Sequence, residues 1–148
     1  MSKIQQGNYT EGENRKQLLE VLKEAQNRFG YLSGDSLVEI AKSFGLPVSE
    51  VYGVATFYSL LSTKPQGKHV IRICKSLPCF LKEYQTIVES VTREIGIKPG
   101  ENTADGRFSF ELVSCIGACD EAPAMMIDHD VYGGLTPGKI SHILRGYR

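Results

Sequence analysis

The sequence lacks an excess of charge of either sign, since its 148 residues include 17 basic and 17 acidic side chains. The balance is also local, with seven of each sign up to Gln66 and ten of each sign after it. Proteins that bind nucleic acid or an anionic membrane surface usually present a strongly basic patch. The charge pattern therefore speaks against both kinds of partner.

Long apolar runs are also missing. No uninterrupted stretch approaches the ~20 residues that a helix needs to cross a bilayer, and the opening residues MSKIQQGNYT lack the apolar core of a signal peptide. We therefore expect a cytoplasmic protein that does not insert into a membrane. The chain also has no glycine pattern of the GxGxxG or P-loop kind, so we do not expect it to bind a nucleotide itself.

The first part of the chain predicts three helices. Residues 10–13 have the T-x-x-E spacing of a capping box, and an apolar stripe at helical spacing follows until Gly30. Asp35 is the expected N-cap of a second helix that ends at Gly45. The third is expected over residues 49–61, SEVYGVATFYSLL, and together the three indicate a small bundle.

A different pattern begins after the turn residues 63–68, where we place a domain boundary between residues 1–66 and 67–148. HVIRIC, residues 69–74, and RFSFELVS, residues 107–114, are typical of strands. A helix is expected between them, over residues 81–95. Two strands joined by such a helix are expected to be parallel, with a right-handed crossover.

The last part of the chain predicts a hairpin and a helix. AMMID and HDVYG are two short strands that turn around Asp128 to Asp130. Thr136 followed by Pro137 is typical of a helix start, and an apolar stripe follows it. The second part should therefore have the order β-α-β-β-β-α.

Four cysteines occur in two local pairs, CKSLPC and CIGAC, and each pair follows a predicted strand. The cysteines are Cys74, Cys79, Cys115 and Cys119. Consecutive parallel strands bring their carboxyl ends to the same edge of a sheet, where ligands commonly bind. We therefore expect the two pairs to form one site with four thiolates.

Three kinds of chemistry could use these thiols. Structural zinc accepts both spacings, whereas disulfides are disfavoured in a reducing compartment. An iron–sulfur cluster needs four thiolates, and its potential depends on backbone hydrogen bonds to sulfur, which the small residues Gly117 and Ala118 would permit. Spacing alone leaves zinc and an iron–sulfur cluster open.

The chain resembles a known family, the thioredoxin-like 2Fe-2S ferredoxin subunit of NADH dehydrogenases. The same subunit type occurs in NAD-linked and electron-bifurcating hydrogenases and in related formate dehydrogenases and transhydrogenases. The resemblance is carried by the C-x4-C and C-x3-C spacings, by TADGRFSFELVSCIGACDEAPAMMI, by YGGLTP and by GVATFYSLL. One departure is that the family commonly has a glycine a few residues after the second cysteine, where this chain has residues 80–83, FLKE.

The resemblance implies an α/β fold class, with a helical N-terminal bundle followed by a thioredoxin-like domain. It implies one 2Fe-2S cluster on Cys74, Cys79, Cys115 and Cys119, and a cis peptide bond at Ala122-Pro123. It assigns no catalytic residue to this chain. The alternative is a non-redox interaction subunit whose four cysteines bind zinc.

The resemblance also implies the partners. The chain would exchange single electrons with a flavin- and NAD-binding subunit, which holds the FMN and the NAD(P), in a complex with further iron–sulfur or catalytic subunits. We expect a soluble bacterial complex. The helical region, residues 1–66, is the expected docking surface.

Overall fold

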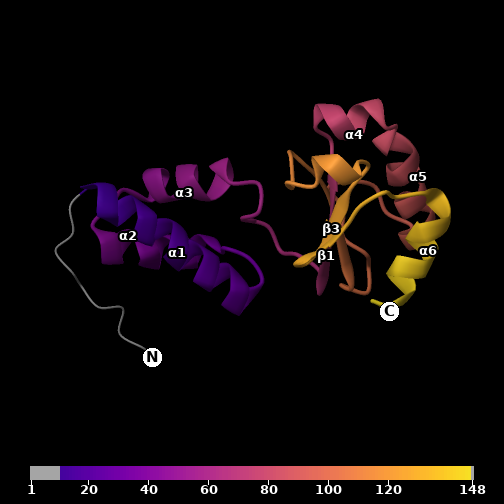
Figure 1. Cartoon of the computed structure of the whole chain (residues 1–148). Helices are drawn as coiled ribbons and strands as arrows, with labels where there is room; N and C mark the ends of the chain where they lie inside the picture. Colours follow the sequence, from indigo (N-terminus) through magenta and orange to yellow (C-terminus); the bar gives the residue numbers. More distant parts are fainter. Residues whose placement is uncertain (1–10, 148) are drawn as a thin grey trace. The chain divides into compact units, whose positions relative to one another are not determined.

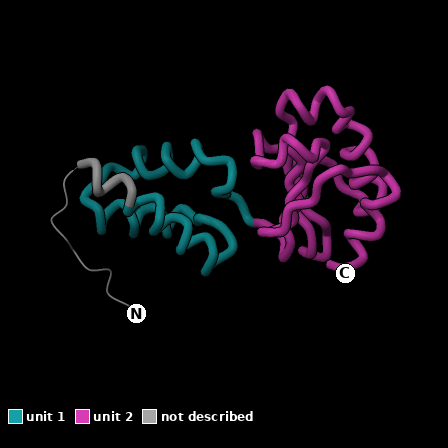
Figure 2. Tube along the Cα trace, in the orientation of Figure 1, with its two compact units in different colours: residues 1–65 teal, residues 66–148 magenta. Residues whose placement is uncertain are grey.

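Three helices precede the sheet in the computed structural model, which describes residues 11–147 and the side chains of residues 17–147 (Figure 1). They are α1 (Glu11–Phe29), α2 (Gly34–Phe44) and α3 (Val48–Phe57). Their apolar faces, together with one residue of the loop between α1 and α2, share one core of buried side chains: Leu18, Leu22, Leu32, Leu37, Ile40, Ala41, Val51 and Ala55. The chain divides into two compact units, residues 1–65 and 66–148 (Figure 2).

Several predicted helix ends are confirmed and others are wrong. Gly30 and Gly45 follow helices with positive φ, as expected of C-terminal stops. The N-cap of α2 is Ser33 and not Asp35, because the extended Ser33 accepts a hydrogen bond from Ser36 N–H at 3.2 Å. The predicted capping box begins at Thr10, which lies outside the described residues.

The third helix is shorter than predicted, since α3 ends at Phe57 and residues 58–61 leave the helix. Tyr58 has an extended backbone, and its carbonyl accepts a turn hydrogen bond from Leu61 N–H at 3.0 Å. Leu61 still packs against the core of the bundle. Leu61 fits the helical spacing of apolar residues although it follows a turn, because it reaches the same core as the residues of α3. The spacing therefore predicted a longer helix than the one that forms.

The second unit holds a four-stranded sheet in the order β2-β1-β3-β4. The strands are β1 (His69–Cys74), β2 (Phe108–Val113), β3 (Met125–Ile127) and β4 (Asp130–Tyr132). The helices are α4 (Leu77–Leu81), α5 (Tyr84–Ile95), the short η1 (Cys119–Glu121) and α6 (Pro137–Arg145). Strands β1 and β2 are parallel and the other two pairings are antiparallel, which confirms the expected crossover unit and hairpin.

One face of the sheet packs against α5 and α6, which lie on the same side of it in Figure 1. This core is built from buried residues of the sheet, of both helices and of the loop before α6: Ile71, Ile73, Ile87, Val91, Phe108, Phe110, Met125, Ile127, Leu135, Ile140 and Leu144. Full burial of each large apolar side chain contributes about 1.5–3 kcal/mol. The core therefore holds the strand ends that carry the cysteines in a rigid frame.

The predicted helix over residues 81–95 is interrupted. α4 ends at Leu81 and α5 begins at Tyr84, because Glu83 between them has φ 56, in the left-handed region. Glycine is the usual residue in that conformation. The family resemblance places a glycine in this part of the chain, and here Glu83 takes the left-handed conformation instead.

Candidate metal centre

The first cysteine pair lies at the junction of β1 and α4. Cys74 is the last residue of β1, and Cys79 lies on α4, which begins after Ser76 with Pro78 in its first turn. Both thiols are nearly inaccessible, with 1% relative exposure each, and they form a small buried cluster with Ala124. The strand-to-helix turn therefore places both sulfur atoms inside the protein.

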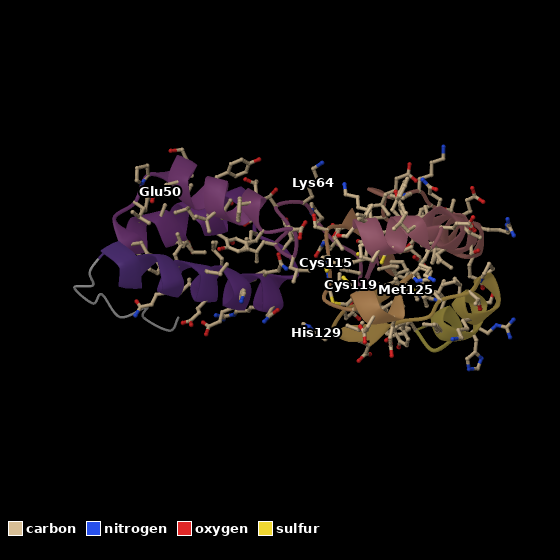
Figure 3. All side chains as sticks on the ribbon, turned by 45° about the horizontal axis from the view of Figure 1, so that its top comes forward. Glu50, Lys64, Cys115, Cys119, Met125 and His129 are labelled. Atoms are coloured by element: carbon tan, nitrogen blue, oxygen red, sulfur yellow. The ribbon has the colours of Figure 1, made fainter. Side chains whose placement is uncertain are left out.

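The second pair lies after β2, and both of its thiols are exposed. The Sγ atoms of Cys115 and Cys119 are 3.2 Å apart, and Figure 3 labels both residues close together. Gly117 between them has φ 85, and its N–H donates to the Cys115 sulfur at 3.3 Å. A side chain at this position would be strained, so glycine allows the tight turn.

The two pairs meet at the edge of the sheet where β1 and β2 end. Lys75 N–H donates to the Val113 carbonyl at 3.0 Å, which joins the strand ends directly. The Ile116 N–H, from the second loop, also forms a hydrogen bond with the Cys74 sulfur. The loop of the second pair therefore reaches the Cys74 sulfur of the first pair.

The thiols also influence one another electrostatically. Burial raises the pKa of Cys79, and the charges of Cys74 and Cys115 raise it further. The pKa of Cys119 is raised first by its hydrogen bond with Cys115, then by burial and by the charges of the other three sulfurs. All four cysteines thus belong to one electrostatic site.

The pKa of Cys74 shifts in the opposite direction to those of Cys79 and Cys119. Burial raises its pKa, but the hydrogen bonds that its sulfur accepts from Ser76 and Cys79 outweigh this effect, so the pKa is lowered overall. A depressed pKa favours the thiolate, which is the form that binds metal.

The donors around the sulfurs fit an iron–sulfur cluster. Cys74 accepts from the Ser76 and Ile116 N–H groups, Cys79 from Ala124 N–H, and Cys115 from Gly117 N–H. Such N–H groups stabilise negative charge on cluster ligands and set the reduction potential. Among the described side chains, those of residues 17–147, no three His, Cys, Asp or Glu side chains are arranged to surround a single metal ion. The thiols are instead arranged as two pairs.

Sequence reasoning missed most of these donors. Ser76 lies between two cysteines and had a local signal, but Ile116 and Ala124 reach sulfurs that are far away in the sequence. Ala124 directly follows Pro123, and the Ala122-Pro123 bond is cis, as predicted. The donor from Ala124 could be recognised only once β3 was placed beside β1.

The three histidines, whose side chains can also bind metal, do not lie within either cysteine pair. His69 is at the start of β1, the end opposite to the cysteines, where its Nδ1 is 2.7 Å from Asp128 Oδ2. His142 is on α6, and His129 is in the turn between β3 and β4. Met125 is fully buried in the core, as expected of a strand residue (Figure 3).

Comparison with known proteins identifies the family. Residues 3–148 match the family model described as thioredoxin-like [2Fe-2S] ferredoxin. The chain belongs to the thioredoxin-like [2Fe-2S] ferredoxin family. This finding confirms the resemblance, the fold class of N-terminal helices followed by a thioredoxin-like α/β domain, and the 2Fe-2S cofactor.

Relatives of this ferredoxin are subunits of larger oxidoreductases. The chain is 42% identical over 130 residues to a subunit of the NADH-quinone oxidoreductase of Escherichia coli K12, covering 88% of this chain and 78% of that protein. It is 38% identical over 130 residues to the HndA subunit of the NADP-reducing hydrogenase of Solidesulfovibrio fructosivorans, covering 88% and 76%. The chain is therefore a member of the subunit type found in both classes of complex.

A solved structure supports the same fold. The crystal structure of an NAD+-reducing [NiFe]-hydrogenase in the air-oxidized state aligns with a TM-score of 0.75 at 25% identity. The alignment covers 88% of this ferredoxin and 22% of the hydrogenase chain.

Among the helices within residues 11–147, none is both long and apolar enough to span a membrane.

Proposed function

We propose that this ferredoxin carries one 2Fe-2S cluster on Cys74, Cys79, Cys115 and Cys119 and exchanges single electrons with a flavin- and NAD(P)-binding partner subunit. The observation that carries the proposal is the meeting of the two thiol pairs beneath backbone N–H donors. When bound, the cluster supplies a centre that changes its oxidation state by one electron.

The protein groups have distinct tasks in this proposal. Cys74 and Cys79 bind from the buried side and exclude water there, whereas Cys115 and Cys119 bind from the exposed side. The N–H groups of Ser76 and Ala124 hold partial positive charge against the sulfurs. No side chain of this chain needs to donate a proton or attack a substrate.

The flavin is assigned to a partner because of the electron count. NADH delivers two electrons together as hydride, so a flavin must separate them before a one-electron centre can take part. The sequence has no GxGxxG or P-loop pattern for a nucleotide. FMN and NAD(P) are therefore proposed on the partner, with further iron–sulfur or catalytic subunits completing the complex.

Two exposed apolar groups are available for docking. One lies on α3 and the residues after it, in the helical region of residues 1–66: Val48, Tyr52, Phe57, Tyr58 and Leu60. The other lies on α4 around buried Cys79, where Leu77, Phe80 and Leu81 are 68%, 53% and 70% exposed. Apolar surface of this kind marks interaction sites. We assign the group on α3 to a contact that holds the partner subunit in place. We assign the group on α4 to the contact that the partner subunit makes next to the cysteines.

The complex itself is proposed by class. A soluble bacterial assembly such as an electron-bifurcating hydrogenase, a formate dehydrogenase or a transhydrogenase would use a subunit of this kind. The similarity to subunits of an NADP-reducing hydrogenase and of NADH-quinone oxidoreductases supports an NAD(P)H-linked partner. Co-purification of the tagged chain, followed by identification of the bound subunits by mass spectrometry, distinguishes these assemblies.

The cluster is tested by anaerobic purification followed by visible absorption and EPR spectroscopy and by iron, sulfide and zinc analysis. A brown protein with two irons and two sulfides per chain, and an EPR signal after reduction, is expected. A colourless protein that holds one zinc per chain would instead establish the zinc-binding interaction subunit and end the electron-transfer proposal.

A further inference from the structure

Gly133, which follows β4 directly, lies so close to Glu121 that there is no room for a side chain. A Cβ atom at position 133 would collide with the Cβ and Oε2 atoms of Glu121 and would lie 3.1 Å from its carbonyl oxygen. Rotation of the Glu121 side chain moves Oε2 away but leaves Cβ where it is. The collision can therefore be relieved only by moving backbone.

The backbone that would move is held by hydrogen bonds from the same segment. Gly134 N–H donates to the Glu121 carbonyl at 2.6 Å, and Leu135 N–H donates to the Pro123 carbonyl at 3.1 Å. Residues 133–135 therefore lie alongside residues 121–123. A shift of the backbone at Gly133 would therefore also move the backbone of residues 121–123.

Residues 121–123 are continuous with Cys119 on one side and with Ala124 on the other, and Ala124 contacts two further cysteines. Cys119 is the first residue of η1 and Glu121 the last, so the two move together. Ala124, at the other end of the strip, accepts from Cys74 N–H at 3.2 Å and donates its own N–H to the Cys79 sulfur. The position of Gly133 is thus coupled to the cysteine site although the residue carries no ligand atom.

We propose that Gly133 is a positioning residue for the cluster: its missing side chain lets residues 133–135 press against residues 121–123 and thereby sets the place of the Cys119 sulfur. The inference rests on the proposed function. The geometry it concerns is the 3.2 Å separation of the Cys115 and Cys119 sulfurs.

The test uses Gly133→Ala in the full chain with its cluster. We expect the cluster to be retained with altered EPR g-values. We also expect the equilibrium constant for one-electron reduction to change by about threefold or more, which corresponds to about 28 mV for a one-electron couple. A wild-type EPR spectrum together with an unchanged potential would overturn the inference.

Two matched controls separate positioning from general strain. A Cβ at Gly138 on α6 meets nothing within 4 Å, so Gly138→Ala should leave the EPR spectrum unchanged. A Cβ at Gly67 would lie 2.7 Å from the backbone of Phe108, the first residue of β2, whereas the cysteines lie where β2 ends. Gly67→Ala should therefore lower the unfolding midpoint without changing the g-values. The same spectral change in Gly67→Ala would reduce the role of Gly133 to ordinary packing.

A rescue variant tests the proposed contact directly. Adding Glu121→Gly to Gly133→Ala removes both side-chain collisions, so the g-values and the potential should return towards those of Glu121→Gly alone. If Gly133→Ala fails to fold, recovery of the clustered protein in the double variant supports the inference, and failure to recover overturns it.

A readout without the cluster distinguishes failure of the inference from failure of the proposed function. In cluster-free protein, diamide should oxidise the Cys115 and Cys119 thiols to an intramolecular disulfide, with both protons and electrons passing to the diamide. Gly133→Ala should slow this closure several-fold and Gly138→Ala should not. An equal rate in Gly133→Ala contradicts the inference, whereas a wild-type chain that never takes up iron contradicts only the proposed function.

Discussion

The sulfur atoms of Cys115 and Cys119 lie 3.2 Å apart at an exposed loop, whereas the partner pair, Cys74 and Cys79, is buried at 1% exposure. One thiol pair therefore faces solvent and the other faces the protein interior. This asymmetry has consequences for how the site reacts before and after a cluster is bound.

In cluster-free protein, the exposed pair should react first with an alkylating reagent. Cys115 and Cys119 should be modified by iodoacetamide at least ~10-fold faster than Cys74 and Cys79, because burial keeps the reagent from Cys74 even though its lowered pKa favours the reactive thiolate. Peptide mapping by mass spectrometry over a time course measures the four rates. Equal rates would contradict the burial described for the first pair.

Replacing a cysteine from either pair should affect the cluster equally. Cys115→Ser and Cys74→Ser should each abolish the normal visible and EPR spectra, although only Cys74 is buried, because each pair supplies half of the four thiolates. Ser114→Ala, next to Cys115, is the matched control and should keep the spectrum. A normal spectrum in either cysteine variant would remove that residue from the ligand set.

The left-handed Glu83 predicts a stabilising substitution. A non-glycine residue in this conformation costs about 1–2 kcal/mol, part of which glycine loses again through greater freedom in the unfolded chain. Glu83→Gly should therefore raise the free energy of unfolding by about 0.5–1 kcal/mol. Urea denaturation followed by circular dichroism measures the change.

The control for this prediction lies on the next helix. Glu89 is exposed in the interior of α5, and Glu89→Gly should destabilise by about 0.5–1 kcal/mol because glycine is a poor helix former. Opposite signs at positions 83 and 89 isolate the effect of backbone conformation. The same sign at both positions would contradict the left-handed assignment.

We expect the stability of the fold to depend strongly on the partner of the buried Arg72. Arg72 is 6% exposed, and its Nε donates to Glu111 Oε2 at 3.2 Å across the β1–β2 pair. Glu111→Leu leaves the guanidinium buried without its partner and should cost about 2–4 kcal/mol, somewhat below a fully buried pair because Glu111 is partly exposed. The combination with Arg72→Met should cost less than Glu111→Leu alone. Denaturation of the single and double variants tests this order.

Tyr147 predicts a loss of stability in alkali. Burial first, and then its hydrogen bonds with Tyr132 and Asp130, raise the pKa of Tyr147 far above its usual value. The folded chain keeps this proton above about pH 10, where tyrosine in the unfolded chain loses it. The contribution of the protonated Tyr147 hydroxyl to the free energy of unfolding is therefore present at neutral pH and falls as the pH rises above 10.

Tyr147→Phe provides the comparison. It removes the hydrogen bond to Asp130 at 2.7 Å and should be less stable than the wild type at pH 8. Its stability should decline less between pH 9 and pH 11, since it has no hydroxyl at position 147 to titrate. Thermal unfolding at both pH values measures the two slopes, and parallel slopes would contradict the predicted linkage.

Much of the fold could be predicted because local patterns specify it. A β-branched run specified β1 and alternating apolar residues specified β2. Gly45 and Gly96 marked helix ends because glycine adopts positive φ at no steric cost. The break at Glu83 could not be predicted from local pattern, because glutamate favours helix. The early end of α3 was hidden because Leu61 packs on the core even though it lies outside the helix.

The sequence by itself determined that four thiols occur in two pairs, each following a strand, because spacing and strand periodicity are local properties of the chain. Only the tertiary structure decided which pair is buried, which N–H groups face the sulfurs, and that Gly133 lies against Glu121. These features depend on contacts between segments that are distant in the sequence. They form only when β3 pairs with β1 and residues 133–135 pack against residues 121–123.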